Sequence, residues 1–258
     1  MTAPTTSEPR LLSPATGPLP GPWRYGGGPR LWTLRVAEHT ERARLREDLL
    51  DPDERARCHG FVRSVDRDRY RVGHVVLREL LGAYLDSDPA AVRLVREPCP
   101  GCSGPHGRPA VAGGPLHFSL SHSGGAVLLG FADVPVGVDV ETEPDAEATQ
   151  DITAVLHPAE RAEIAGLSPR DRPGAVARCW ARKESYLKGV GIGLGEDPAR
   201  TYVGTGPAPG AVPGWTLTDV PVLPGYAAAC AVRTPGPPAA APQTASRIPG
   251  NASTSSST

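Results

Sequence analysis

Lysine is almost absent from this sequence of 258 residues. Only two of its 27 lysine and arginine residues are lysines, Lys183 and Lys188. Both lie in the stretch WARKESYLK, residues 180–188, on either side of Glu184. A carboxylate beside a flexible ammonium group suits a metal-bound phosphate, because the carboxylate can ligate a hard cation while the ammonium neutralises phosphate oxygens. The alternative is a solvated ion pair, since Glu184 and Lys188 share one helical face at a spacing of i and i+4.

Other absences exclude broad classes of protein. The net charge is −1, so no overall basic field indicates nucleic acid. No apolar run reaches the roughly 18 residues of a membrane span, because Asp133 and Pro135 interrupt even residues 126–138. The five cysteines are an odd number, and no secretory hydrophobic segment stands near the start. We therefore expect a soluble, cytoplasmic protein without a disulfide framework.

The length allows one large domain or two small ones. Glycine and proline, 30 residues of each, gather at the two ends and in loops. Residues 1–29 are expected to form a flexible lead-in and residues 235–258 a disordered tail. Between them we expect an N-terminal subdomain, 30–141, and a C-terminal subdomain, 142–234, that opens with an acidic linker at residues 142–150.

The N-terminal half reads as helices followed by strands. We expect a strand at 31–36, a helix at 42–50, a mostly helical region at 53–85 with a break near 61–64, and a strand at 91–96. Apolar residues at spacings of three and four in 66–85 indicate a buried helix. Arginines such as Arg57 and Arg69 surround that stripe. Each one alone fits a solvated face, but as a group they could form a cationic wall for phosphate.

Residues 116–140 read as three short strands. The first, LHFSLSHS, alternates and ends in Ser121, His122 and Ser123 before two glycines. Hydroxyls, an imidazole and exposed backbone amides at a strand end can accept a phosphate. An ordinary hairpin turn is the alternative.

The third of these strands ends in two carboxylates, Asp139 and Glu141. Side chains at i and i+2 of a strand share a face, so both project the same way. Together they could form a Mg²⁺ site that keeps positions open for water and a substrate phosphate. A polar strand exit is the alternative, and a third carboxylate such as Glu184 would favour the metal site.

The C-terminal half repeats this order of elements without visible sequence repetition. We expect helices at 158–167 and 171–188, a glycine-rich loop from 189 to 195, and strands at 201–203, 215–220 and 226–232. The loop GVGIGLG follows a helix instead of opening one, so it is not a dinucleotide fingerprint.

The loop at residues 98–109 contains Cys99, Cys102 and then His106. A CxxC followed by a histidine can be half of a zinc site. A second pair of ligands is not visible at any usual spacing, so we favour loop cysteines without a metal.

Three motifs resemble one known family. GVDVE at 137–141, WARKESYLKGVGIGL at 180–194 and FSLSHSGG at 118–125 are similar to motifs of the phosphopantetheinyl transferases, of the larger monomeric type that activates nonribosomal peptide and polyketide synthases. The resemblance extends over residues 31–233. It implies a pseudo-twofold α+β fold, in which each of two similar subdomains packs helices on a small, mostly antiparallel sheet and the active site lies in the cleft between them.

The resemblance also implies a reaction and its machinery. Such enzymes move the phosphopantetheine arm of coenzyme A onto a serine of an apo carrier protein and release adenosine 3′,5′-bisphosphate. By position, Asp139, Glu141 and Glu184 would hold Mg²⁺, or Mn²⁺ in its place. Glu184, or a water it orients, would take the serine proton. Lys188 would contact the pyrophosphate and stabilise or protonate the leaving group.

Further positions would bind coenzyme A. Ser121 and His122 would contact the nucleotide phosphates, with His122 on the 3′-phosphate. Arg108 stands where the family usually has a lysine, which keeps the charge but changes its geometry. The weaker candidates are Arg57, Arg69 and Lys183.

The implied partners are apo acyl, peptidyl or aryl carrier domains, with no nucleic acid and no membrane, and the implied state is a monomer. Two other classes of function stay open at this point. A Mg²⁺-dependent phosphohydrolase could use the same three carboxylates, and a non-catalytic carrier-binding protein could keep the same fold.

Overall fold

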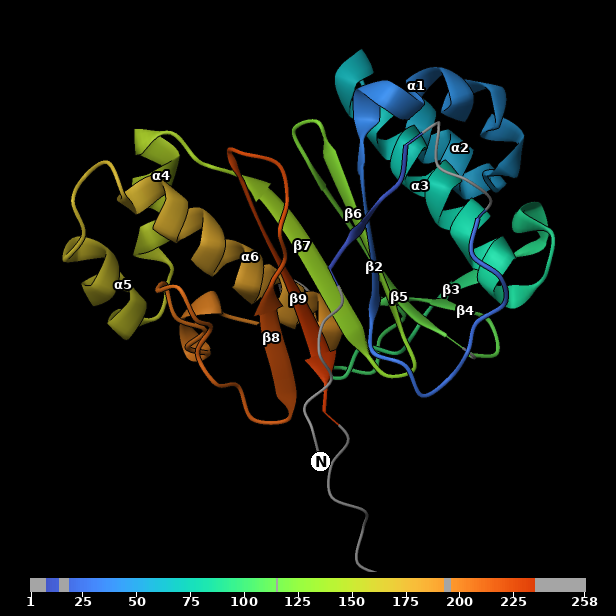
Figure 1. The fold of residues 1–258 in the computed structure, drawn as a ribbon. Coiled ribbons are helices and arrows are strands. Elements are labelled where there is room, and N and C mark those ends of the chain that lie inside the picture. Colours follow the sequence, from blue (N-terminus) through green and yellow to red (C-terminus); the bar gives the residue numbers. More distant parts are fainter. Residues whose placement is uncertain (1–7, 14–18, 115, 193–195, 235–258) are drawn as a thin grey trace, which may run out of the picture.

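The computed structural model describes residues 8–13, 19–114, 116–192 and 196–234. It is a mixed α/β fold in which the strands lie between two groups of helices, α1 to α3 on one side and α4 to α6 on the other (Figure 1). The helices are α1 Val36–Leu45, α2 Pro52–His59, α3 Ser64–Leu85, α4 Ala146–Ala154, α5 Pro158–Ala165 and α6 Arg172–Val190, and short 3₁₀ turns occur at Glu47–Leu49, Pro89–Ala91 and Pro198–Arg200.

The strands form three sheets. The first has the order β1-β2-β6-β5, in which β1 is parallel to β2 and the other pairs are antiparallel. A two-stranded hairpin, β3-β4, stands beside it, and the antiparallel third sheet has the order β7-β9-β8. The bounds are β1 Arg10–Leu11, β2 Arg30–Arg35, β3 Leu94–Arg96, β4 Pro109–Val111, β5 His117–Ser123, β6 Ala126–Ala132, β7 Val136–Thr142, β8 Trp215–Asp219 and β9 Tyr226–Arg233.

The expected break in the first long helical region is confirmed between α2 and α3. Helix α2 begins at a capping box, in which the Asp51 side chain accepts from the backbone N–H of Glu54 and the Glu54 side chain accepts from that of Asp51. Helix α3 buries its apolar stripe, including Val72, Val76 and Leu80, in the core under the first sheet. Burial of this stripe, rather than any N-terminal cap, holds α3 in place.

Helix α6 packs directly against β7 and β9 (Figure 1). A Cβ atom on Gly137 would come within 2.0 Å of the Ser185 carbonyl oxygen and 2.4 Å of the Gly189 nitrogen. Only glycine therefore permits this approach of strand to helix. The consequence is that the last turn of α6, with Lys188, lies beside the carboxylate-bearing end of β7.

Serine side chains of β5 join the first sheet to the third. The Ser119 hydroxyl accepts from the backbone N–H of Val138 at 3.0 Å, and the Ser123 hydroxyl accepts from that of Thr142 at 3.3 Å. Because β5 and β7 belong to different sheets, these side chains replace a backbone ladder at the junction. The alternation of the sequence places every second side chain of β5 on this seam.

Several expectations need correction. Residues 142–150 are not a simple linker, because α4 begins at Ala146, where the Asp145 side chain accepts from the backbone N–H of Ala148 at 2.9 Å. Residues 201–203 form no strand, and the N–H of Val203 donates to Glu160 at 2.7 Å instead. The first helix begins at Val36 rather than at residue 42, because the chain passes from β2 into α1 without a loop.

Within the described part of residues 1–29, some residues pack against the fold and others, including residues 24–28, are exposed. Strand β1 pairs with β2, and Leu12 is buried. The indole of Trp23 donates to the Asp133 carboxylate at 2.5 Å. Residues 1–7 and 14–18 lie outside the described residues, as does the expected tail from 235 to 258.

Nearly all of strand β7 precedes the expected boundary between residues 141 and 142. The strand nevertheless hydrogen-bonds with β9 of the C-terminal part.

Within the described ranges, none of the helices combines the length and apolar composition needed to cross a membrane.

Candidate active site

Asp139 is the centre of a buried polar cluster where β5, β7 and the end of α6 meet. The Lys188 ammonium lies 2.5 Å from Asp139 Oδ1 and donates to the Ser121 hydroxyl at 2.9 Å. Ser121 in turn donates to Asp139 Oδ1 at 2.7 Å. Asp139 is almost inaccessible to solvent, and burial raises the pKa of its carboxyl against the opposing effect of Lys188.

Glu141 lies two residues further along β7 and on the same face as Asp139. Ser123 donates to its Oε2 at 3.0 Å. Burial, followed by the nearby charge of Asp139, raises the pKa of Glu141 to about 7. The negative charge of Glu184 also raises the pKa of Glu141.

Glu184 comes from α6, one turn before Lys188. Its pKa is raised, first by burial and then by the charge of Asp139. Glu184 Oε1 and Asp139 Oδ2 are both buried, and neither has a hydrogen-bond partner in the part of the chain that the structure describes. Two unpaired buried carboxylate oxygens beside a third carboxylate are costly unless a cation or water satisfies them.

This donor set fits a hard divalent cation. Carboxylate oxygens are the ligands that Mg²⁺ prefers, and Mg²⁺ keeps several waters when it binds through a few carboxylates. Among the described residues, these three carboxylates do not each offer an oxygen within 4.8 Å of the others. In this arrangement one ion would therefore be bound directly by at most two of the three carboxylates and through a water by the third. Asp139, Glu141 and Glu184 are the residues that would hold the ion.

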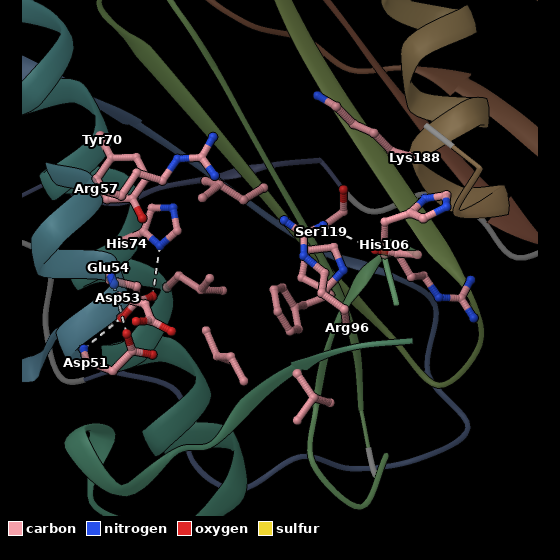
Figure 2. Close-up of a pocket in the computed structure, with 18 of the residues that line it drawn as sticks. Asp51, Asp53, Glu54, Arg57, Tyr70, His74, Arg96, His106, Ser119 and Lys188 are labelled. Carbon is pink, nitrogen blue, oxygen red and sulfur yellow. Dashed lines mark hydrogen bonds and ion pairs between the residues drawn. The ribbon is translucent and has the colours of Figure 1, made fainter. Parts of the chain in front are cut away.

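A cavity of about 850 Å³ lies beside this cluster (Figure 2). It is bounded by α2, α3, the β3-β4 hairpin, β5 and the end of α6. Lys188 borders it on the side away from the acidic residues Asp51, Asp53 and Glu54 (Figure 2). The volume suits a ligand of nucleotide size. Its basic and aromatic lining comprises Arg57, Phe61, Tyr70, His74, Arg96, His106, Arg108, Phe118, His122 and Lys188.

Besides Lys188, the structure brings three of the expected phosphate-binding residues to this cavity. Arg57 lies over the ring of Tyr70, with 5.9 Å between the guanidinium carbon and the ring centroid. His122 is largely buried, and burial lowers its pKa, so its imidazole is biased towards the neutral form. Arg108 donates to the Gly189 carbonyl at 2.7 Å and pairs with Glu97 at 2.8 Å.

Two expected residues have other surroundings. Ser121 points to Asp139 and Lys188 and is not among the described residues that line the cavity. Arg69 also lies outside that lining and donates to the Gly124 carbonyl at 2.8 Å. Arg69 therefore fastens the β5-β6 turn to α3, which positions the end of β5.

Lys183, a weaker candidate for binding coenzyme A in the sequence, has other surroundings. Its side chain is buried on another face of α6, where the ammonium pairs with Glu160 at 2.7 Å and donates to the Thr201 carbonyl at 2.6 Å. Lys183 precedes Lys188 by five residues, so the two lysines do not share a helical face. The pair of Lys183 and Glu160 holds α6 to α5.

Sequence reasoning missed several cavity residues. The spacing of Tyr70 assigns it to the buried stripe of α3, but its ring also borders the cavity. Arg96 stands in an alternating strand, and His74 lies in the same helix as Tyr70 with its ring stacked on Tyr70 at a centroid distance of 4.0 Å. Spacing along the chain does not show which side chains of a buried helix reach a cavity.

Comparison with known proteins finds one family. Residues 135–213 match the model of the 4′-phosphopantetheinyl transferase superfamily, a region that includes Asp139, Glu141, Glu184 and Lys188. This part of the chain is therefore similar to members of that superfamily.

Three curated relatives are similar over longer stretches. A phosphopantetheinyl transferase of Thraustochytrium sp. is 33% identical over 64% of this chain and 61% of its own length. The 4′-phosphopantetheinyl transferase Sfp of Bacillus subtilis is 25% identical over 57% of this chain and 62% of its own. The 4′-phosphopantetheinyl transferase HetI of Nostoc sp. is 27% identical over 74% of this chain and 81% of its own. The chain thus spans about three fifths of the first two relatives.

Proposed function

We propose that this protein transfers the 4′-phosphopantetheine arm of coenzyme A to a serine of an apo carrier protein and releases adenosine 3′,5′-bisphosphate. The observation that carries the proposal is the position of Lys188, which joins the Asp139 cluster on one side and the basic cavity on the other. The similarity of residues 135–213 to the superfamily supports the same activity. The cavity would hold the nucleotide, and the cluster would face its pyrophosphate.

In this proposal the reaction depends on Mg²⁺, and Mn²⁺ could replace it. Asp139, Glu141 and Glu184 would hold the ion, and the unpaired oxygens of Asp139 and Glu184 support this assignment. The bound ion would neutralise pyrophosphate charge and polarise the phosphate under attack.

Glu184 is the proposed general base. The carrier serine attacks the β-phosphate of coenzyme A, and its hydroxyl proton must leave as the new P–O bond forms. If Glu184 Oε1 holds the ion, the second oxygen of the same carboxylate is left to take the proton. The proton would pass to Glu184 directly or through one water.

Lys188 would stabilise the leaving group. As the bond between the β-phosphate and the bridging oxygen breaks, negative charge grows on the departing adenosine 3′,5′-bisphosphate. An ammonium at the cavity edge, with its side chain 32% exposed, can follow that charge or donate a proton to it. Its attachment to Asp139 and Ser121 holds it ready in the free protein.

The other phosphates would bind to the basic residues of the cavity. His122 has an unpaired buried Nδ1 within the described residues, which suits a contact with the 3′-phosphate. Arg57 and Arg108 would supply charge on neighbouring walls. Ser121 and Arg69 act as positioning residues in this scheme, through Lys188 and Gly124.

We further infer that the acceptors are acyl, peptidyl or aryl carrier domains of nonribosomal peptide or polyketide synthases, and that the protein acts as a cytoplasmic monomer. The four-stranded and the three-stranded sheet, each with its own helices, are compatible with a pseudo-twofold pair of subdomains.

The test is the mass of the carrier. Protein, coenzyme A, Mg²⁺ and each of several apo carriers are incubated, and one added phosphopantetheine arm per carrier is expected. Excess chelator and Glu184→Gln should both suppress the added mass, while Arg170→Gln, a change at an exposed surface arginine, should not. Unchanged mass with every carrier would overturn the proposal. Phosphate release without any carrier would favour a phosphohydrolase instead.

A further inference from the structure

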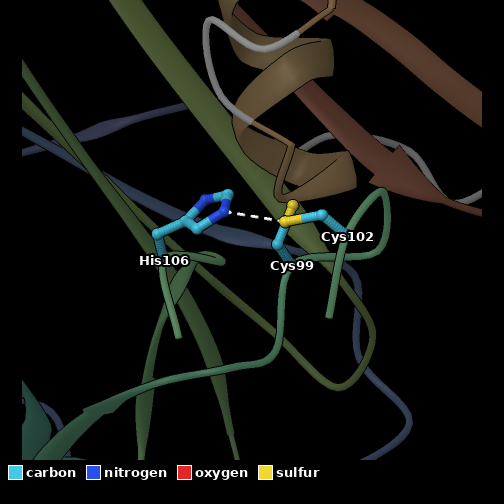
Figure 3. Close-up of side chains that lie close together, drawn as sticks. All are labelled: Cys99, Cys102 and His106. Carbon is cyan, nitrogen blue, oxygen red and sulfur yellow. Dashed lines mark hydrogen bonds between the residues drawn. The ribbon is translucent and has the colours of Figure 1, made fainter. Parts of the chain in front are cut away.

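The loop between β3 and β4 brings three metal-ligating side chains together (Figure 3). One atom each from Cys99, Cys102 and His106 lies within 4.8 Å of the other two. The Cys102 sulfur and His106 Nε2 are 2.9 Å apart. Across the described residues, this is the one trio of histidine, cysteine or acidic side chains gathered so closely.

The backbone of this loop holds the three side chains in that arrangement. The N–H of Cys99 donates to the Gly104 carbonyl at 2.8 Å, and the N–H of Ser103 donates to the Cys99 carbonyl at 2.7 Å. Ser103 adopts a left-handed conformation with φ of 60°, which is uncommon outside glycine. A Cβ on Gly104 would come within 2.9 Å of the His106 ring. The tight turn therefore requires Gly104 where the histidine folds back over the cysteines.

The Cys99 sulfur accepts hydrogen bonds from the backbone N–H groups of Gly101 and Cys102 and from the Cys102 thiol, so it points into the turn beside the other two side chains. Cys99 is buried, whereas Cys102 and His106 are exposed, so an ion could reach the cluster from solvent.

We propose that Cys99, Cys102 and His106 bind one Zn²⁺ ion. Two sulfurs and an imidazole nitrogen match the ligands that Zn²⁺ takes in tetrahedral sites, whereas Mg²⁺ prefers oxygen. Binding displaces the two thiol protons to solvent, and the two thiolates balance the charge of the ion. Water fills the fourth position. This site is separate from the carboxylate cluster, and the proposal does not rest on the transferase function.

The zinc site would fix the hairpin that carries Arg108 to the cavity. The N–H of Gly107 donates to the Glu97 carbonyl at 2.9 Å, and the N–H of Glu97 donates to the Arg108 carbonyl at 3.0 Å. These bonds tie the end of the metal loop to the start of β4. His106 also borders the cavity itself (Figure 2). An ion at the three ligands would therefore limit the movement of Arg108 relative to Gly189.

The first experiment measures metal content and ligand type on the full chain. We expect one zinc per chain after purification with added Zn²⁺ and dialysis, measured by mass spectrometry of the metal. Replacement by Co²⁺ should give the intense visible absorption of a tetrahedral site and a sulfur-to-cobalt band. Cys102→Ser and His106→Ala should each lower the bound metal at least tenfold. Cys58→Ala and His59→Ala are matched controls elsewhere in the fold and should keep it.

Some results would overturn the proposal. One is a chain that binds no zinc with all thiols reduced, and another is a Co²⁺ spectrum without a sulfur band. A disulfide between Cys99 and Cys102 that forms in air and persists with added Zn²⁺ would also exclude the site. Asp139→Asn distinguishes it from the carboxylate cluster, because this variant should keep the cobalt–sulfur band unchanged. Circular dichroism of each variant shows whether its fold is intact.

Discussion

The Lys188 ammonium and Asp139 Oδ1 lie 2.5 Å apart, and this ion pair fastens the last turn of α6 to β7. The two partners differ in exposure, since 32% of the Lys188 side chain but only 2% of the Asp139 side chain reaches solvent. Asp139 keeps a second oxygen without a partner in the described chain. The second oxygen of Asp139 is thus available to a further positive charge, while Lys188 also lines the cavity.

Asp139→Asn should separate catalysis from folding. The amide keeps the shape of the side chain and its Oδ1 can still accept from Ser121 and Lys188, so the metal-free variant should remain folded. Loss of a metal ligand should lower kcat by about 100-fold or more. Carrier modification rates and thermal melts with and without Mg²⁺ check this. Full activity would contradict the metal assignment.

The two lysines should behave differently when each is changed to methionine. Lys183→Met leaves Glu160 buried without its cationic partner, which should cost about 3 to 5 kcal/mol in the free energy of unfolding. The remaining folded molecules should keep their affinity for coenzyme A. Urea unfolding and calorimetry measure these two quantities.

Lys188→Met should show the opposite pattern, with a larger loss of kcat than of stability, because its side chain is partly exposed and Asp139 keeps the bond from Ser121. Suppose that Lys188→Met turns over coenzyme A normally and Lys183→Met no longer binds it. Lys183 would then be the residue of the active site and Lys188 the structural one.

The stability of the metal-free protein should fall as pH rises through neutrality. The pKa of Glu141 is raised to about 7 in the folded state, above the ordinary 4.5 of the unfolded chain. The folded state therefore binds the proton more tightly. Its contribution to stability is present in full below the unfolded pKa and is lost as pH rises through about 7. The change should be on the order of 2 kcal/mol between about pH 5 and pH 8.

Mg²⁺ should oppose that loss, because ligation needs ionised carboxylates, so its stabilising effect should grow over the same interval. Denaturant unfolding at several pH values, with chelator or with Mg²⁺, measures both trends. Glu141→Gln should flatten the metal-free profile. A parent profile that is already flat would contradict the raised pKa.

Gly137→Ala tests the close approach of α6 to β7. The added methyl would meet the Ser185 carbonyl oxygen and the Gly189 nitrogen far inside contact distance, so the helix must move away. We expect a loss of about 3 kcal/mol or more in the free energy of unfolding, together with lost activity. Gly174→Ala is the matched control in α6, because its methyl would meet only a Glu143 carboxylate at 3.5 Å. That variant should be as stable as the parent or more stable.

Local patterns predicted much of the fold. The strands β5, β6 and β7, the break before α3, and the helices α5 and α6 agree with expectation because each has a strong period or a clear start and stop signal. The prediction of an acidic linker at residues 142–150 was wrong because Asp145 caps the start of a helix there. The first helix was misplaced because β2 passes into α1 without a turn residue to mark the change.

Some features of the candidate site could likewise be predicted from the sequence, and others could not. Periodicity alone placed Asp139 and Glu141 on one face of a strand, and Glu184 and Lys188 on one face of a helix, since both spacings follow from backbone geometry. Only the tertiary structure decided that these two faces meet, because Gly137 lets α6 approach β7 and the serines of β5 join two sheets.

The two lysines and the cysteine loop show why the sequence alone does not reveal which residues a side chain contacts. Lys183 and Lys188 are near neighbours in the chain, yet one is buried against Glu160 and the other borders the cavity. His106 meets Cys102 only through the turn at Ser103 and Gly104. The spacing of residues determines which side chains share a face, whereas the packing of distant segments determines what that face touches.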